Sequence, residues 1–250
     1  MRVRILIALA LVGALAGCQE SGFDESKETQ RPLKVQDAMN PLTGTKVPGQ
    51  AERPATLTHD ALGDTLALRV KPVAAVIGTT RVPPYLRGAT RGLRILGDLD
   101  VAAIEKAKPD VIVGAKEFDA EAYPELMKVA PTILTEGFNW KLNLRLHGEA
   151  LGRTNDAEEL LVDWDNRVAK VKQLIGDEKV SIRLTVTRPT AEVSFEPDTP
   201  AGSTLADLGI KPHKPFRRDG RVLDVTGGQE WNDGGVLAAR ARLEEIANAL

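Results

Sequence analysis

The residues best suited to bind a ligand gather in the stretch TTRVPPYLRG, residues 79–88. Arg81 and Arg87 carry planar guanidinium groups that donate paired hydrogen bonds to anionic oxygen atoms. Tyr85 adds a flat apolar face on a loop stiffened by two prolines. The stretch predicts a binding loop for an anionic ligand. The alternative is a solvated loop in which Tyr85 packs as a cap.

Two further candidate ligand residues follow short apolar runs that are typical of buried strands. His59 stands at the start of a predicted helix, and Lys116 follows the run 111–113. Ligands of α/β sheets bind beyond the carboxyl ends of the strands, so both side chains are placed at a binding edge. An ordinary surface histidine and a solvated lysine are the alternatives.

No motif of an enzyme is present. The sequence has no Gly-x-Ser-x-Gly elbow, Gly-rich phosphate loop or His-Glu-x-x-His pair. The acidic pair Glu158-Glu159 is most simply a solvated helix turn. The three histidines lie far apart and there is one cysteine, which leaves no internal disulfide and no metal site of this kind. We therefore expect no catalysis.

The single cysteine, Cys18, follows a targeting segment. Two arginines precede an uncharged apolar run, residues 5–16, which is too short to span a bilayer and suits a secretory signal. The run ends in Leu15-Ala16-Gly17-Cys18, which resembles the lipobox of bacterial lipoproteins. Residues 1–17 are thus a predicted signal peptide, and Cys18 a lipid-bearing anchor outside the cytoplasm. The alternative is a buried N-terminal helix with a free thiol.

Charge and composition narrow the class of protein further. Without residues 1–17, which carry two arginines and no acid, the formal net charge falls from −2 to −4. This balance gives no basis for nucleic-acid binding, which requires a basic surface. Residues 18–40 are polar, mixed in charge and without apolar periodicity, and they predict a flexible tether.

From about residue 55, helical and strand patterns alternate. THDALGDTLALRV places Leu62, Leu66 and Val70 on one helix face with Thr58 as a possible N-cap. Three apolar strands follow, KPVAAVIG, Val111–Val113 and Thr132–Leu134, the last two each preceded by a short helix. Short, doubly buried strands between helices indicate a mostly parallel sheet, which we assign to an N-terminal lobe of residues 41–153.

One predicted helix is much longer than the others. NDAEELLVDWDNRVAKVKQLI carries apolar residues at helical spacing, with Asn155 and Glu158 as a capping pair and Gly176 at its end. Strand patterns resume in VSIRLTVTR and AEVSFE. The sequence therefore predicts an α/β protein with two Rossmann-like lobes, the helix 154–176 joining the first lobe to a second one of residues 177–250.

In this order of elements the chain resembles the substrate-binding lipoproteins of bacterial iron-siderophore ABC transporters. These are helical-backbone periplasmic binding proteins, in a wider group that also carries haem and cobalamin. The resemblance covers most of the chain after the lipobox. Its pieces are TGTKVPGQAERPATLTHDALGDTLALRVKPVAAV, VPPYLRG, LDVAAIEKAKPDVIVG, YPELMKVAPTIL, NWKLNLRLHGEALGRTNDAEELL and FEPDTPAGSTLADLGI.

The resemblance implies a monomeric receptor that holds a ferric siderophore, or a related chelate, between its lobes and delivers it to an ABC permease. Lobe movement would be small because a helix joins the lobes. Iron would enter as part of the chelate, so no cofactor and no protein-bound metal are expected. Neither the class of chelate nor the membrane leaflet follows from the sequence. The alternative is a trimmed, non-transport lipoprotein, a scavenger or an assembly partner.

Second-lobe ligand residues are implied by the same resemblance. The arginine that the family often uses falls at Val186, with Arg188 on the same strand face and Arg183 on the other. Arg188 is therefore the predicted ligand residue, and Arg183 a surface charge. Trp231, in the loop GGQEWNDGG, matches a tryptophan near the cleft, and we expect it to be displayed. Trp140 and Trp164 are expected to pack helices.

The chain departs from the family pattern in two places. IKPHKPFRRDGRVLDVTGG passes almost directly to the final strand, which predicts a shortened second lobe lacking one strand and its helices. The missing segment usually carries an acid that docks on the permease. Its first-lobe counterpart falls at Ala102, with Glu105 the nearest acid.

Overall fold

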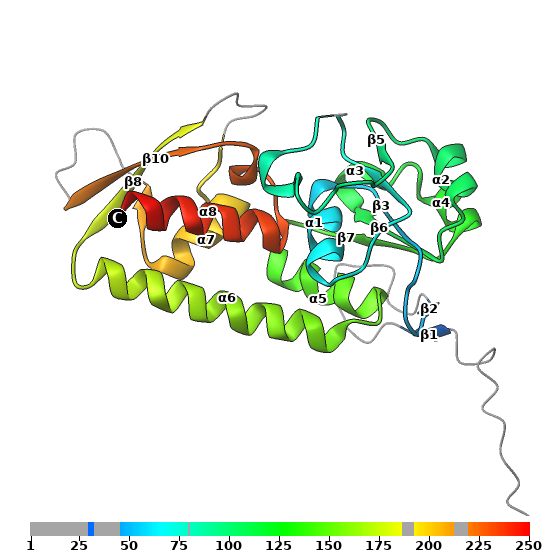
Figure 1. The fold of residues 1–250 in the computed structure, drawn as a ribbon, viewed down its shortest axis with the longest axis horizontal. Coiled ribbons are helices and arrows are strands. Elements are labelled where there is room, and N and C mark those ends of the chain that lie inside the picture. Colours follow the sequence, from blue (N-terminus) through cyan, green and yellow to red (C-terminus); the bar gives the residue numbers. More distant parts are fainter. Residues whose placement is uncertain (1–29, 33–45, 80, 187–192, 213–219) are drawn as a thin grey trace, which may run out of the picture.

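The chain forms two lobes at opposite ends of an elongated molecule (Figure 1). The computed structural model describes residues 30–32, 46–79, 81–186, 193–212 and 220–250. Cys18 and Arg188 lie outside these ranges. Within them, no helix combines the length and the apolar character that a membrane span needs.

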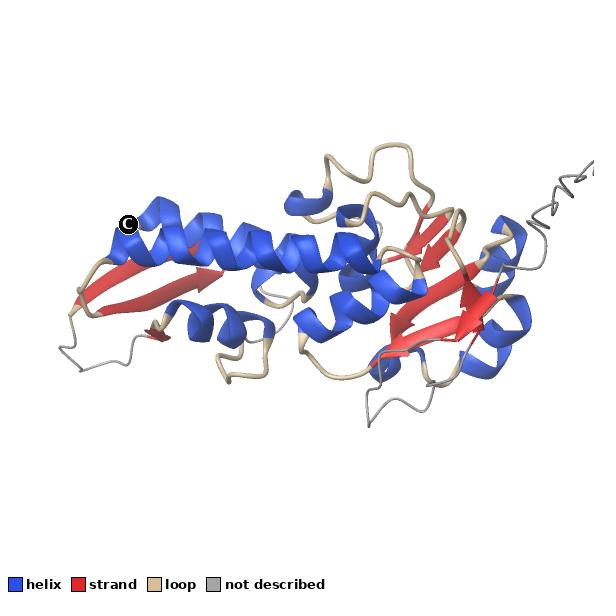
Figure 2. Cartoon of the chain, turned by 90° about the horizontal axis from the view of Figure 1, so that it is seen from below, coloured by secondary structure: helices blue, strands red, loops and turns tan. Residues whose placement is uncertain are grey.

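The first lobe is built on a five-stranded parallel sheet in the order β5-β4-β3-β6-β7. Helices lie on both sides of this sheet (Figure 2). The strands are β3 (Pro54–Thr56), β4 (Ala74–Val76), β5 (Ile95–Leu96), β6 (Val111–Ala115) and β7 (Thr132–Thr135). The helices are α1 (His59–Ala67), η1 (Pro84–Leu86), α2 (Val101–Ala107), α3 (Lys116–Asp119), α4 (Tyr123–Val129) and α5 (Trp140–Ala150). A short antiparallel pair, β1 (Gln30–Pro32) and β2 (Lys46–Pro48), precedes them.

Local signals set the ends of these elements, and the predicted N-cap Thr58 is confirmed. The Thr58 side chain accepts a hydrogen bond from the Ala61 amide and caps α1, and Asp100 caps α2 in the same way through Ala103. Lys108 takes a left-handed conformation, φ 52°, and ends α2 just before Pro109. The strands that follow are buried on both faces, which explains their continuous apolar runs.

The long helix α6 (Thr154–Ile175) is present and ends at Gly176, but its predicted N-cap is wrong. Asn155 lies inside the helix, the N-cap position is Arg153, and no side chain caps it. The turn from α5 is closed by the backbone, because the Arg153 amide donates to the Gly148 carbonyl at 2.6 Å. This tight return fixes the start of α6 before Asn155 can act as a cap.

The second lobe contains a three-stranded parallel sheet in the order β10-β8-β9. Val193–Phe195, part of the predicted AEVSFE strand, is not a strand. Gly202 and Ser203 lie inside α7 rather than in a turn, and a Cβ atom on Gly202 would collide with the Glu196 carbonyl. The elements are β8 (Val180–Val186), α7 (Pro200–Leu208), β9 (Lys211–Pro212), β10 (Arg221–Gly227), η2 (Gln229–Trp231) and α8 (Gly235–Ala249).

One hydrophobic core extends through both lobes. It includes Val113 of the first sheet and Ile182 and Leu223 of the second. Trp140 and Trp164 join the two parts edge to face, with ring centroids 5.1 Å apart, and both are buried as predicted. The lobes are therefore held by packed side chains as well as by the α6 backbone.

The C-terminal helix α8 is a second connection between the lobes. It packs against α1 and α5 as well as α6 and α7. In Figure 1 its N-terminal end lies beside α1 and its C-terminal end beside β8 and β10. Two helices, not α6 alone, thus span the molecule.

Candidate functional site

The carboxyl edge of the first sheet faces the second lobe. Beyond β3, Asp60 accepts a hydrogen bond from the Gly234 amide at 2.8 Å. Beyond β7, the Lys141 ammonium lies 2.8 Å from an oxygen of Asp207 on α7. The carboxyl end of β10 leads into η2 and Gly234, on the opposite side of the same contact. The two sheets therefore direct their ligand-binding edges toward each other.

Tyr85 connects the lobes through its hydroxyl group. It donates to Asp233 Oδ2 at 2.7 Å, and burial, together with the nearby Asp233 carboxylate, raises the pKa of Tyr85 well above its usual value. His59 lies on the same side, its Nδ1 atom 3.8 Å from Asp233 Oδ1. Both side chains thus face one carboxylate of the second lobe.

Of the other first-lobe candidates, Arg81 and Arg87 are exposed and Lys116 is half-buried. Arg81 and Arg87 flank η1 at the surface, after β4. Lys116 is the first residue of α3, directly beyond β6, and its ammonium lies 3.1 Å from Glu136 Oε1. The two arginines follow β4 and the lysine follows β6, two strands that β3 separates, and the charge of Lys116 is already paired.

Two second-lobe predictions fall within the described residues. The surface position of Arg183 is confirmed, and the expected display of Trp231 is wrong. Arg183 is an exposed charge, 2.8 Å from Asp224. Trp231 is not displayed: it is 1% exposed, its indole N–H donates to Glu245 at 2.5 Å, and it packs edge to face on Phe195. The glycines around Trp231 make room for its buried ring instead of exposing it, because a Cβ atom on Gly227 would collide with the indole.

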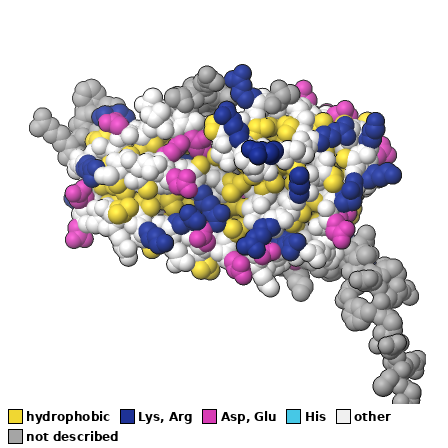
Figure 3. Space-filling model, viewed as in Figure 1, with side chains coloured by type: hydrophobic (Ala, Val, Ile, Leu, Met, Phe, Trp, Pro, Cys, Tyr) yellow, Lys and Arg dark blue, Asp and Glu magenta, His cyan; other side chains and the backbone are white. Residues whose placement is uncertain are grey.

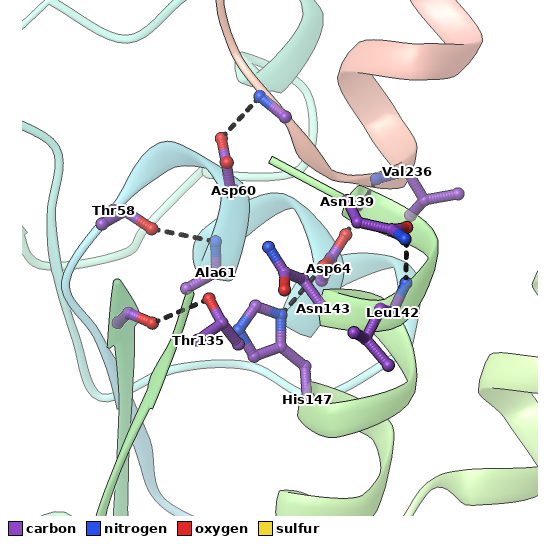
Figure 4. A network of polar contacts seen from close by, with 12 residues as sticks. Thr58, Asp60, Ala61, Asp64, Thr135, Asn139, Leu142, Asn143, His147 and Val236 are labelled. Carbon is purple, nitrogen blue, oxygen red and sulfur yellow. Dashed lines mark hydrogen bonds and ion pairs between the residues drawn. The ribbon is translucent and has the colours of Figure 1, made fainter. Parts of the chain in front are cut away.

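A buried polar network behind these residues was not predicted. Asp64 is fully buried and accepts from His147 Nδ1 and from the Val236 amide, both at 2.8 Å (Figure 4). Because the carboxylate can only accept, His147 carries its proton on Nδ1. The i, i+4 spacing of Asp60 and Asp64 in a helix with a buried face was the signal that could have revealed this network.

The network shifts the pKa of one of its carboxyl groups, that of Asp60. Burial raises the pKa of Asp60 to about 7, and the charges of Asp233 and Asp64 add to this, while the Gly234 amide opposes it. Arg242 supplies the buried positive charge. It donates to the carbonyls of Glu230 and Asp233 and to Thr204 Oγ1.

The surface and cavities elsewhere offer no comparable site among the described residues. Three cavities of about 360, 290 and 280 Å³ lie against α6, and none is lined by a predicted ligand residue. On the face in Figure 3, basic and acidic side chains are mixed over α6. One such pair on this helix is Arg167 and Asp163, 2.6 Å apart. No three His, Cys, Asp or Glu residues gather in the described ranges as a metal site would require.

Comparison with known proteins agrees with this geometry. The family model "Periplasmic binding protein" matches residues 55–216, and the chain belongs to this family. The family consists of binding proteins rather than enzymes and implies a location outside the cytoplasm.

Individual relatives are similar over most of this chain. The probable siderophore-binding lipoprotein YfiY of Bacillus subtilis (strain 168) is 30% identical over 83% of the chain and 66% of its own length. The achromobactin-binding periplasmic protein of Dickeya dadantii (strain 3937) is 28% identical over 64% of the chain and 56% of its own length. The chain thus spans about two thirds or less of these relatives. Staphylococcus aureus SirA complexed with staphyloferrin B has the same fold, with a TM-score of 0.58 at 23% identity over 85% of this chain and 82% of its own.

Proposed function

We propose that this protein is a lipid-anchored extracytoplasmic receptor that binds a ferric siderophore, or a similar metal chelate, between its lobes and delivers it to an ABC importer. The observation that carries the proposal is the opposition of two parallel sheets at their carboxyl edges. Arg81 and Arg87 lie in the segment whose Tyr85 contacts Asp233, and Lys116 begins α3 beyond β6. The family and the names of the relatives support a chelate as cargo.

Arginines supply the anion-binding part of the proposed site. Arg81 and Arg87 follow β4, and Arg188 follows β8 in the sequence, so the two lobes would grip the chelate from both sides. Their guanidinium groups suit the anionic oxygen donors that surround ferric iron. His59 and Lys116 would stand at the margin, and iron would be held by the chelator alone.

Anchoring and delivery are separate parts of the proposal. Cys18 would carry the lipid, and the tether predicted over residues 18–40, of which Gln30–Pro32 pairs with β2, would let the folded part reach a permease. On α2, Ala102 and Glu105 are both exposed, so Glu105 is available as the first-lobe acid in permease docking. Uptake of radioactive iron by cells carrying the protein, with or without Glu105→Gln, measures delivery independently of binding.

Binding is tested by calorimetric titration of residues 19–250, which contain every described residue. The titrants are the ferric complexes of a hydroxamate, a catecholate and citrate, with the iron-free chelators as controls. We expect saturable binding of one class and weaker binding by Arg81→Gln and Arg87→Gln. Arg183→Gln, an exposed arginine paired with Asp224, is the matched control that should bind normally. A folded protein that binds none of the complexes would refute the proposal and favour a non-transport lipoprotein.

A further inference from the structure

Two exposed phenylalanines occupy equivalent positions beyond adjacent strands. β6 and β7 pair in parallel, with Ala115 opposite Thr135 as the last pair. Phe118 and Phe138 each come three residues later in their own segment. Phe118 is 73% exposed and Phe138 is 46% exposed.

Side-chain contacts continue the strand register up to these rings. One residue beyond the last pair, Lys116 Nζ lies 3.1 Å from Glu136 Oε1. At the next position, Glu117 Oε1 accepts from the Gly137 amide at 2.6 Å. The two segments are therefore fastened side by side, and the phenylalanines follow at the same edge.

The edge is also rigid on its inner side. Asp119 accepts from the Ala115 amide at 2.9 Å and holds α3 against the end of β6. Asn143 of α5 donates to the Gly137 carbonyl at 3.1 Å. The rings are thus presented by a fixed frame rather than by loose loops.

This edge lies next to the second lobe. Lys141, three residues after Phe138, contacts Asp207 of α7. Of the large hydrophobic side chains exposed in the described ranges, these two are the aromatic ones; the others are Met127, Val162 and Leu174. Exposed apolar residues are ordinary when scattered, but two aromatic rings at matched positions on a ligand-binding edge are not.

Charge at this edge indicates which part of a ligand it would meet. Lys116 is paired with Glu136, and Glu117 adds a second acid. A ligand with many carboxylates would meet negative charge here and be repelled. The apolar face of a ligand would instead cover the two rings and leave these ion pairs intact. The anionic oxygen atoms of a chelate would instead be bound by Arg81 and Arg87.

We propose that Phe118 and Phe138 form a subsite for the apolar face of an amphipathic chelate, one that has methylene or aryl backbone on one side and anionic oxygen donors on the other. The inference rests on the proposed function and adds a class of substrate to it. Such a ligand loses more apolar surface to the protein than a small polycarboxylate complex does. The subsite therefore favours chelates with an extended backbone over ferric citrate.

The test compares Phe118→Ala and Phe138→Ala with Val162→Ala and Leu174→Ala, which remove similarly exposed side chains from the outer face of α6. Calorimetry measures binding of ferric desferrioxamine B, a ferric tris-catecholate and ferric citrate. We expect at least one backbone-bearing complex to bind more tightly than ferric citrate. Each phenylalanine variant should weaken it about tenfold, with unchanged melting temperature, and the α6 controls should not.

The outcomes separate this inference from the proposed function. If a complex binds and both phenylalanine variants keep its affinity, the subsite is refuted while the receptor function stands. Preferred binding of ferric citrate refutes the substrate class in the same way. If the variants bind normally but fail to support iron uptake in cells, the rings serve a protein partner instead of the chelate. If the folded chain binds no complex, the receptor function itself fails, and the subsite with it.

Discussion

The protonation of Asp60 predicts an unusual dependence of stability on pH. Its pKa is raised from 3.8 to about 7, first by burial and then by Asp233 and Asp64, against the Gly234 amide and the charge of Arg242. The folded state therefore holds the proton more tightly than the unfolded state. The stabilisation of the folded state by protonated Asp60 is complete below pH 4 and is lost as the pH rises toward 7. Asp60→Asn, which is neutral at every pH, removes this dependence.

The size of the effect follows from the shift. A shift of about three pKa units corresponds to about 4 kcal/mol at 1.36 kcal/mol per unit. Because Asp60 keeps part of its surface exposed, we expect about half of this in practice. Asp60→Asn should thus equal the native protein in stability near pH 3.5 and exceed it by about 2 kcal/mol near pH 8.

Urea denaturation at a series of pH values measures this difference. The native protein also contains Asp119 and Glu245, whose pKa values burial raises to about 6 and about 7, so only the difference between variant and native protein isolates Asp60. Asp224→Asn, at an exposed position, is the matched control and should show a flat difference across the interval. A flat difference for Asp60→Asn as well would refute the argument from burial.

Three further predictions concern the lobe junction, the core and the anchor. Tyr85→Phe removes the donor to buried Asp233 and should cost about 1–3 kcal/mol, read from urea midpoints at pH 7; no loss would mean that water replaces the hydroxyl. Trp164→Ala opens a cavity beside Trp140 and should cost about 3–5 kcal/mol by the same assay, and a cost under 1 kcal/mol would contradict a shared core. Cys18→Ala should move the protein from the membrane to the soluble extracytoplasmic fraction, and continued lipid attachment would disprove the anchor.

Elements governed by local chemistry could be predicted from the sequence. Thr58 and Gly176 mark helix ends because a side-chain acceptor and a left-handed residue act on the backbone beside them. The strand Val111–Ala115 is recognisable because both of its faces are buried. These signals need no knowledge of distant segments.

Features that depend on contacts between segments far apart in the sequence could not be predicted in this way. Trp231 stands among glycines, yet Glu245 and Phe195 arrive from two other segments and enclose it. Tyr85 finds its partner 148 residues away, at Asp233. The N-cap of α6 is misassigned for a related reason, since a backbone contact to Gly148 replaces the expected side-chain cap.

The shared core bears on how this protein could recognise a ligand. Closing the lobes by a wide swing would separate Trp140 from Trp164 and break the buried contacts of α8 with α1, because both helices α6 and α8 cross the junction. Packed cores resist such deformation, so the two binding edges should be nearly in place before a ligand arrives. Affinity and specificity would then reside in the loop side chains at those edges. Substitutions at Arg87 or Phe118 should consequently change which chelate binds while leaving the arrangement of the lobes unchanged.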